Sequence, residues 1–150
     1  MIAIINGPNI NLLGIREPEI YGDIRWEEIQ KNLEKEALNL NIELICFQSN
    51  YEGAIVDFIQ ENLYEIEGVV INPASFTISG YSIVDALEAI HIPFVEVHMS
   101  NIFSRGGWHS ESVFAEKAVG HICGFKENVY YLGLKAITSY LKQKRSKNNE

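Results

Sequence analysis

The sequence of 150 residues is poor in basic residues: 12 Lys and Arg stand against 20 Asp and Glu, for a formal net charge of −8. Binding of nucleic acid depends on a dense basic surface, so this charge argues against a nucleic-acid partner. Apolar runs are short, and none approaches the roughly 18 residues of a membrane-spanning helix. The first residues, MIAIINGPN, lack the basic start and the cleavage site of a secretory signal. We therefore expect a cytoplasmic protein with no membrane partner.

Cysteine is nearly absent, with only Cys46 and Cys123, each inside an apolar run. We expect two reduced, buried thiols rather than a disulfide between them. The composition is otherwise ordinary for a globular domain, with 47% hydrophobic and 21% charged residues. We predict a single domain over residues 1–150, because this length supports one substantial core. We also expect a frayed polar tail over about residues 143–150.

Motifs for cofactors are missing as well. No GxGxxG follows the first predicted strand and no GxxxxGK(S/T) occurs, which argues against nucleotide binding by either device. The histidines have no partners at the spacing of zinc ligands, and the lysines fall on polar helix faces unsuited to a Schiff base. The sequence thus predicts neither a cofactor nor a metal site. The histidines are His91, His98, His109 and His121.

The apolar pattern alternates between strand and helix along the chain. Two stretches, 7–23 and 99–112, show no periodicity, and loops of this length often bind ligands. The predicted strands are 1–6, 42–48, 69–72, 94–98 and 119–124, and the predicted helices are about 25–40, 55–63, 80–91 and 130–141.

Five apolar strands joined by helices predict an α/β fold with a five-stranded parallel sheet covered on both faces. Right-handed crossovers favour the strand order 2-1-3-4-5 of a flavodoxin-like three-layer sandwich. Ligands bind beyond the carboxyl ends of the strands in such folds. We therefore expect the functional residues directly after the predicted strands.

Glu96 and His98 share one face of the predicted strand 94–98, because side chains alternate along a strand. A carboxylate two residues from a histidine can bind one ring nitrogen and stabilise the imidazolium. His98 also stands at the strand's carboxyl end, where ligands bind. A core histidine held by a structural glutamate is the alternative interpretation. The backbone amides of Met99 and Ser100 could hold a carboxylate in the same crevice.

The first loop carries Asn9, Arg16 and Tyr21, the last two separated by Pro18. A nearby guanidinium favours the phenolate form of tyrosine, in which tyrosine can act as a base. A surface arginine and a packing tyrosine explain the same residues equally well.

Four segments resemble the type II 3-dehydroquinate dehydratases, in the same order and at similar spacing. They are INGPNINLLGIREPEIYG in the first loop, QSNYEGAIVDFIQ from Gln48, INPASFT from Ile71, and VEVHMSN from Val95. The resemblance extends to about Leu141. It implies a flavodoxin-like, cofactor-free hydro-lyase that converts 3-dehydroquinate to 3-dehydroshikimate, in the shikimate or quinate pathway. It also implies a small-molecule substrate and a homo-dodecamer built from trimers.

The resemblance implies roles in proton transfer for four matching residues. Tyr21 would remove the proton α to the ketone, and Arg16 would activate Tyr21. His98 would protonate the departing hydroxyl, with Glu96 orienting its imidazole.

The resemblance implies contacts with the substrate for further residues. Asn9 would hold a water molecule against the enolate oxygen, and Asn72 would bind near the leaving group. The amides of Met99 and Ser100 would hold the substrate carboxylate. Asp85 would reach the site of a neighbouring subunit.

Two substrate-binding positions depart from the family's pattern. Ile78 stands where the family usually has a histidine, and His109 where it usually has an arginine. The residues for proton transfer are kept, so the departures bear on the substrate more than on the reaction. Two alternatives stay open: a relative acting on another cyclic polyol ketone or acid, and a non-catalytic oligomeric binding protein.

Overall fold

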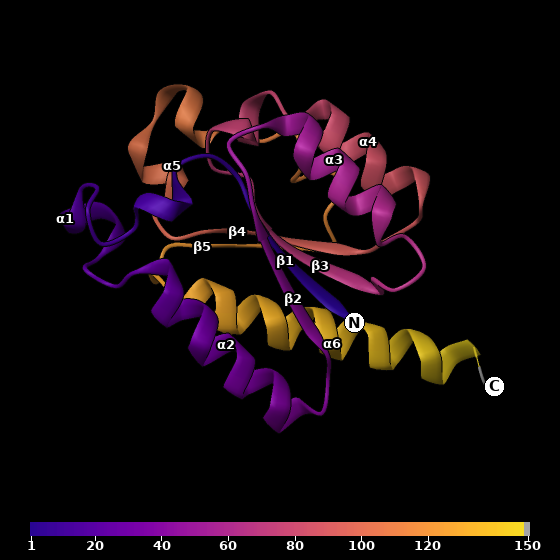
Figure 1. Ribbon diagram of the computed structural model, residues 1–150. Helices are drawn as coiled ribbons and strands as arrows, with labels where there is room; N and C mark the ends of the chain where they lie inside the picture. The colour runs from indigo at the N-terminus through magenta and orange to yellow at the C-terminus, as the bar shows by residue number, and fades with distance from the viewer. Residues whose placement is uncertain (149–150) are drawn as a thin grey trace.

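A parallel sheet of five strands forms the middle layer of the fold. The strands are β1 (Ile2–Asn6), β2 (Leu44–Gln48), β3 (Gly68–Asn72), β4 (Phe94–His98) and β5 (Gly120–Cys123). This computed structural model describes residues 1–148. The strand order is β2-β1-β3-β4-β5, which confirms the predicted flavodoxin-like topology (Figure 1).

Four longer helices cover the two faces of the sheet. They are α2 (Trp26–Leu40), α3 (Glu52–Glu61), α4 (Tyr81–Ala89) and α6 (Asn128–Asn148). Helices α2 and α6 lie on one face, and α3 and α4 lie on the other (Figure 1). Ile2 and Ile4 of β1 pack in the core beneath α2 and α6, whereas Ala3 and Ile5 pack beneath α3 and α4. Because both faces are covered, the central strands are almost wholly apolar.

The two segments predicted as irregular contain short helices. Pro18 begins one of them at the position where a fixed φ suits a helix, and the Asn101 side chain caps another by accepting a hydrogen bond from the amide of Phe103 at 3.2 Å. Each element spans about one turn, which is too short to show an apolar repeat. They are a 3-10 turn (Ile10–Leu12), α1 (Pro18–Tyr21), α5 (Ile102–Arg105) and a second 3-10 turn (Gly107–Ser110).

The last helix runs further than predicted. Helix α6 continues past Leu141 to Asn148, through residues that are mostly good helix formers, with no glycine or proline to end it. Arg145 in this segment pairs with Glu67. Residues 149–150 lie outside the described residues, and fraying of the tail in solution stays a prediction.

Gly7 carries the chain from β1 across the end of β3. Its amide donates to the carbonyl oxygen of Asn72 at 2.8 Å. A Cβ atom on Gly7 would come within 2.1 Å of the carbonyl oxygen of Pro73, so a larger residue does not fit unless the backbone moves. The first loop and the turn after β3 are therefore held together at the carboxyl end of the sheet.

Cys46 and Cys123 are free thiols on the two edge strands, β2 and β5. Both are half-buried, so the prediction of full burial is wrong, because an edge strand is covered less than a central one. Burial raises the pKa of the Cys46 thiol to about 12, which makes it a poor nucleophile. Within residues 1–148, no helix combines the length and the apolar composition needed to cross a membrane.

Candidate active site

A cleft opens at the carboxyl ends of the central strands, where the first loop, the turn after β3 and the segment after β4 meet. The parallel sheet gathers these segments, although they lie far apart in the sequence. Nine of the eleven residues predicted for the site line this cleft. They are Asn9, Arg16, Tyr21, Asn72, Ile78, His98, Met99, Ser100 and His109.

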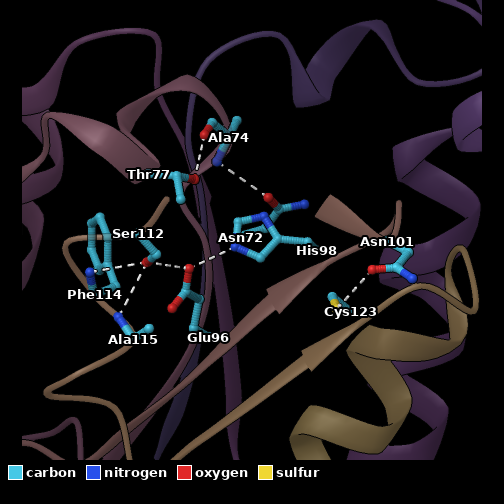
Figure 2. A network of polar contacts seen from close by, with 10 residues as sticks. All are labelled: Asn72, Ala74, Thr77, Glu96, His98, Asn101, Ser112, Phe114, Ala115 and Cys123. Atoms are coloured by element: carbon cyan, nitrogen blue, oxygen red, sulfur yellow. Dashed lines mark hydrogen bonds and ion pairs between the residues drawn. The ribbon is translucent and has the colours of Figure 1, made fainter. Parts of the chain in front are cut away.

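Glu96 and His98 form a buried pair in the wall of the cleft (Figure 2). Glu96 is fully buried, and its Oε1 lies 2.6 Å from Nε2 of His98. The Ser112 hydroxyl donates to the same oxygen at 2.6 Å. Ser112 is itself fixed by the amides of Phe114 and Ala115, each donating at 3.1 Å. This network orients the His98 ring towards the cleft.

Glu96 is held as a carboxylate. Burial raises its pKa, but hydrogen bonds from His98 and Ser112 outweigh burial, and the pKa lies below its ordinary value. A carboxylate only accepts hydrogen bonds, so Nε2 of His98 carries the hydrogen in their contact. Nδ1 is then the ring nitrogen through which His98 can give a proton to a ligand. Glu96 accepts the hydrogen of Nε2 and so fixes this orientation of the ring.

Asn72, at the end of β3, is oriented by a buried tyrosine. Its Nδ2 donates to the Tyr130 hydroxyl at 2.8 Å, and that hydroxyl donates to Oδ1 of Asn6 at 2.8 Å. Oδ1 of Asn72 accepts the Ala74 amide at 3.2 Å. Burial raises the pKa of Tyr130, so its hydroxyl keeps its hydrogen. The second hydrogen of Nδ2 remains for a ligand in the cleft.

Two guanidinium groups lie beside Tyr21 in α1. Nη1 of Arg105 donates to the Tyr21 hydroxyl at 3.3 Å. Cζ of Arg16 lies 4.9 Å from the centre of the Tyr21 ring, and its Nε pairs with Glu17 at 3.3 Å. Arg16, predicted to activate Tyr21, thus contacts the ring face, while Arg105 contacts the hydroxyl. Two cations therefore lie against Tyr21, one at its hydroxyl and one over its ring.

Residues 1–138 match the protein family described as Dehydroquinase class II. The chain belongs to this family. Curated relatives named 3-dehydroquinate dehydratase include those of Prochlorococcus marinus strain MIT 9301 and Halothermothrix orenii. The first is 53% identical over 140 residues, covering 93% of this chain and 95% of the relative. The second is 47% identical over 142 residues, covering 95% and 96%.

Solved structures of similar proteins support membership of the same family. The type II dehydroquinase from Butyrivibrio crossotus superposes with a TM-score of 0.87 and 40% identity, covering 91% of this chain and 95% of that one. A 3-dehydroquinate dehydratase-like protein from Bifidobacterium longum has a TM-score of 0.68 and 26% identity, covering 94% and 97%. The class II dehydroquinase fold is therefore shared over nearly the whole chain.

The two residues predicted to depart from the family's pattern both line the cleft. Ile78 lies in the turn after β3 and is 36% exposed. His109 stacks on the Trp108 ring, with the ring centres 3.7 Å apart. An apolar side chain and an imidazole therefore face the cleft at these two positions.

Asp85 lies outside the cleft. It is exposed on α4 and lines a separate surface groove with Glu88 and Lys117. Its predicted contribution to the site of a neighbouring subunit stays a prediction.

Several residues of this site were not predicted from the sequence. Arg105 and Ser112 lie in the stretch 99–112, which shows no periodicity, and a search there for donors to Tyr21 and Glu96 would have singled them out. Tyr130 lies at the start of the predicted helix 130–141, and nothing in the sequence signals its contact with Asn72.

The structure also brings together three side chains that could hold a metal ion, which the spacing of the histidines did not indicate. Glu96, His98 and His121 each offer a ligand atom, and these atoms lie within 4.8 Å of one another. Spacing along the chain could not show this cluster, because His121 comes from the neighbouring strand β5. Burial lowers the pKa of His121, so its ring is neutral and carries a lone pair.

Proposed function

We propose that this protein is a hydro-lyase that converts 3-dehydroquinate to 3-dehydroshikimate and water. Its curated relatives carry the name 3-dehydroquinate dehydratase. The main support is the meeting of two side chains in one cleft: Tyr21, with two guanidinium groups beside it, and His98, paired with the Glu96 carboxylate. Elimination of water β to a ketone needs one group to take a proton and another to give one. This pair provides both.

In the first step, the Tyr21 phenolate takes the proton from the carbon α to the ketone, and the electron pair moves onto the ketone oxygen to form an enolate. Arg105 donates a hydrogen bond to the Tyr21 oxygen, and Arg16 lies over the Tyr21 ring. Asn9 lines the same cleft and would hold a water molecule against the enolate oxygen. A hydrogen bond aimed at developing charge lowers the barrier more than one made equally in the ground state.

In the second step, the enolate collapses and the β carbon–oxygen bond breaks. His98 gives its proton to the departing hydroxyl, which leaves as water, and Glu96 stabilises the imidazolium until then. Asn72 would bind near the leaving group, and the amides of Met99 and Ser100 would hold the substrate carboxylate. All steps use groups of this chain.

The direct test is an assay of the purified protein with 3-dehydroquinate. We expect a rise in absorbance from the conjugated enone product, without added metal or nucleotide. Treatment with borohydride in the presence of substrate should leave the activity intact, because no lysine takes part. A well-folded sample with no turnover between about pH 6 and 9 would refute the proposed function.

We also propose a cytoplasmic location, a place in the shikimate or quinate pathway and a homo-dodecamer built from trimers. Asp85 on the outer helical layer would then complete the site of a neighbouring subunit. We expect light scattering to give a species far heavier than the 17.0 kDa chain. A monomer at the concentrations of the assay would contradict both the assembly and the role of Asp85.

We expect the activity to rise when positions 78 and 109 receive the residues expected from the family's pattern. We expect Ile78→His and His109→Arg to raise kcat/KM for 3-dehydroquinate, because each adds a polar contact in the cleft worth ~1–3 kcal/mol, or about 5- to 150-fold. The two effects need not add, since both side chains face one ligand. Steady-state kinetics of the single and double variants measures them. Unchanged kinetics would mean that these positions do not touch the substrate.

A further inference from the structure

His121 joins Glu96 and His98 on one face of the sheet. Strands β4 and β5 are parallel neighbours, with Glu96 directly opposite His121 in the register. His98 follows two residues after Glu96 and therefore points to the same side. The rings of His98 and His121 meet edge to face, with their centres 5.3 Å apart.

Two buried polar atoms of this cluster have no hydrogen-bond partner within residues 1–148. They are Oε2 of Glu96, whose side chain is fully buried, and Nε2 of His121. Unpaired buried polar atoms are costly and uncommon, so each calls for a physical reason. A carboxylate oxygen and an imidazole nitrogen both offer lone pairs, and a cation placed between them would satisfy both.

We propose that Glu96, His98 and His121 bind a divalent transition-metal cation of the class of Zn²⁺, and that the bound cation blocks proton transfer by His98. Imidazole and carboxylate are ligands that zinc takes readily, whereas magnesium and calcium favour oxygen ligands alone. Ligand atoms on one tetrahedral zinc ion lie about 3.4 Å apart, since each is about 2.1 Å from the metal. The ligand atoms of the three side chains lie within 4.8 Å of one another, so they need to approach only slightly to bind one ion.

The bound cation would act as an inhibitor. It takes the Nε2 lone pair of His98 and the charge of Glu96, and the proton that these two groups share leaves to the solvent as the metal binds. His98 then keeps one hydrogen, on Nδ1, and giving it to the departing hydroxyl would leave an unfavourable imidazolate, so the proton transfer is blocked. This second half of the proposal rests on the proposed function, whereas binding of the metal does not.

Equilibrium dialysis against zinc chloride tests the binding. Metals are first removed from the protein with a chelator. After dialysis against zinc, we expect elemental analysis to count one zinc per wild-type subunit. The variant His121→Gln should bind zinc far more weakly, by more than the roughly 10–100-fold typical for loss of a group that only supports a ligand. His91→Asn is the matched control: His91 is exposed, and asparagine tolerates its left-handed φ of 56°. It should bind zinc as the wild type does.

The same samples test the inhibition. Zinc should suppress dehydration of 3-dehydroquinate by the wild type and by His91→Asn, and a chelator should restore it. The variant His121→Gln should resist the same zinc concentrations, and its melting curve shows whether it is folded. Failure of wild type to bind zinc, or equal binding by His121→Gln, would overturn the site. If zinc bound through His121 but did not inhibit dehydration, the proposal that the cation blocks proton transfer by His98 would be wrong. A protein that binds zinc there but never turns over substrate would keep the site and refute the proposed function.

Discussion

The variant Tyr21→Phe is expected to lose ~10²–10⁴-fold in kcat on 3-dehydroquinate, the usual effect of removing a general base. Phenylalanine keeps the ring that lies beneath Arg16 and removes only the hydroxyl that Arg105 contacts. The ring packing and α1 should therefore survive. KM should change little, because the lost group takes a proton and is not the main contact of the bound substrate.

Tyr64→Phe is the matched control for this substitution. Tyr64 is 95% exposed and lies outside the cleft, so removal of its hydroxyl should leave kcat unchanged. Melting curves of both variants should resemble that of the wild type. If Tyr21→Phe worked at nearly the wild-type rate, another group would be taking the proton, and the assignment of Tyr21 would be wrong.

The sheet was predictable because its strands are covered on both faces. Buried strands such as β1 and β3 are apolar up to a final asparagine, and glycine or proline follows each strand, so the pattern in the sequence is clear. Short elements such as α1 and α5 leave no comparable pattern. Their positions depend on one proline and one asparagine cap, together with contacts across the cleft.

The part of the candidate site that depends on the geometry of a single strand could be predicted from the sequence. Alternation along β4 places Glu96 and His98 side by side, and the structure has them 2.6 Å apart. Contacts between distant segments were not predictable in this way. Arg105 reaches Tyr21 across 84 positions of the chain, and His121 reaches Glu96 only because β5 lies beside β4 in the sheet. Such pairs depend on the packing of loops and on strand register, which one sequence does not reveal.

The variant His98→Asn should separate the two proton transfers. Asparagine cannot supply a proton, so dehydration should fall by ~10²–10⁴-fold. Its amide can still donate to Glu96, which spares the buried carboxylate the loss of a partner. Tyr21 is untouched in this variant and should still take the α proton and return it. In deuterated water, we therefore expect NMR to show deuterium entering 3-dehydroquinate at the α carbon although little product forms.

The comparison with Tyr21→Phe makes this result specific. That variant should lose exchange and dehydration together, because the first step fails, whereas His91→Asn should keep both at the wild-type level. The Ser112 hydroxyl can still donate to Glu96 in all three proteins. If His98→Asn lost exchange as completely as dehydration, His98 would be needed before the enolate forms. Its assignment to the departing hydroxyl alone would then be incorrect.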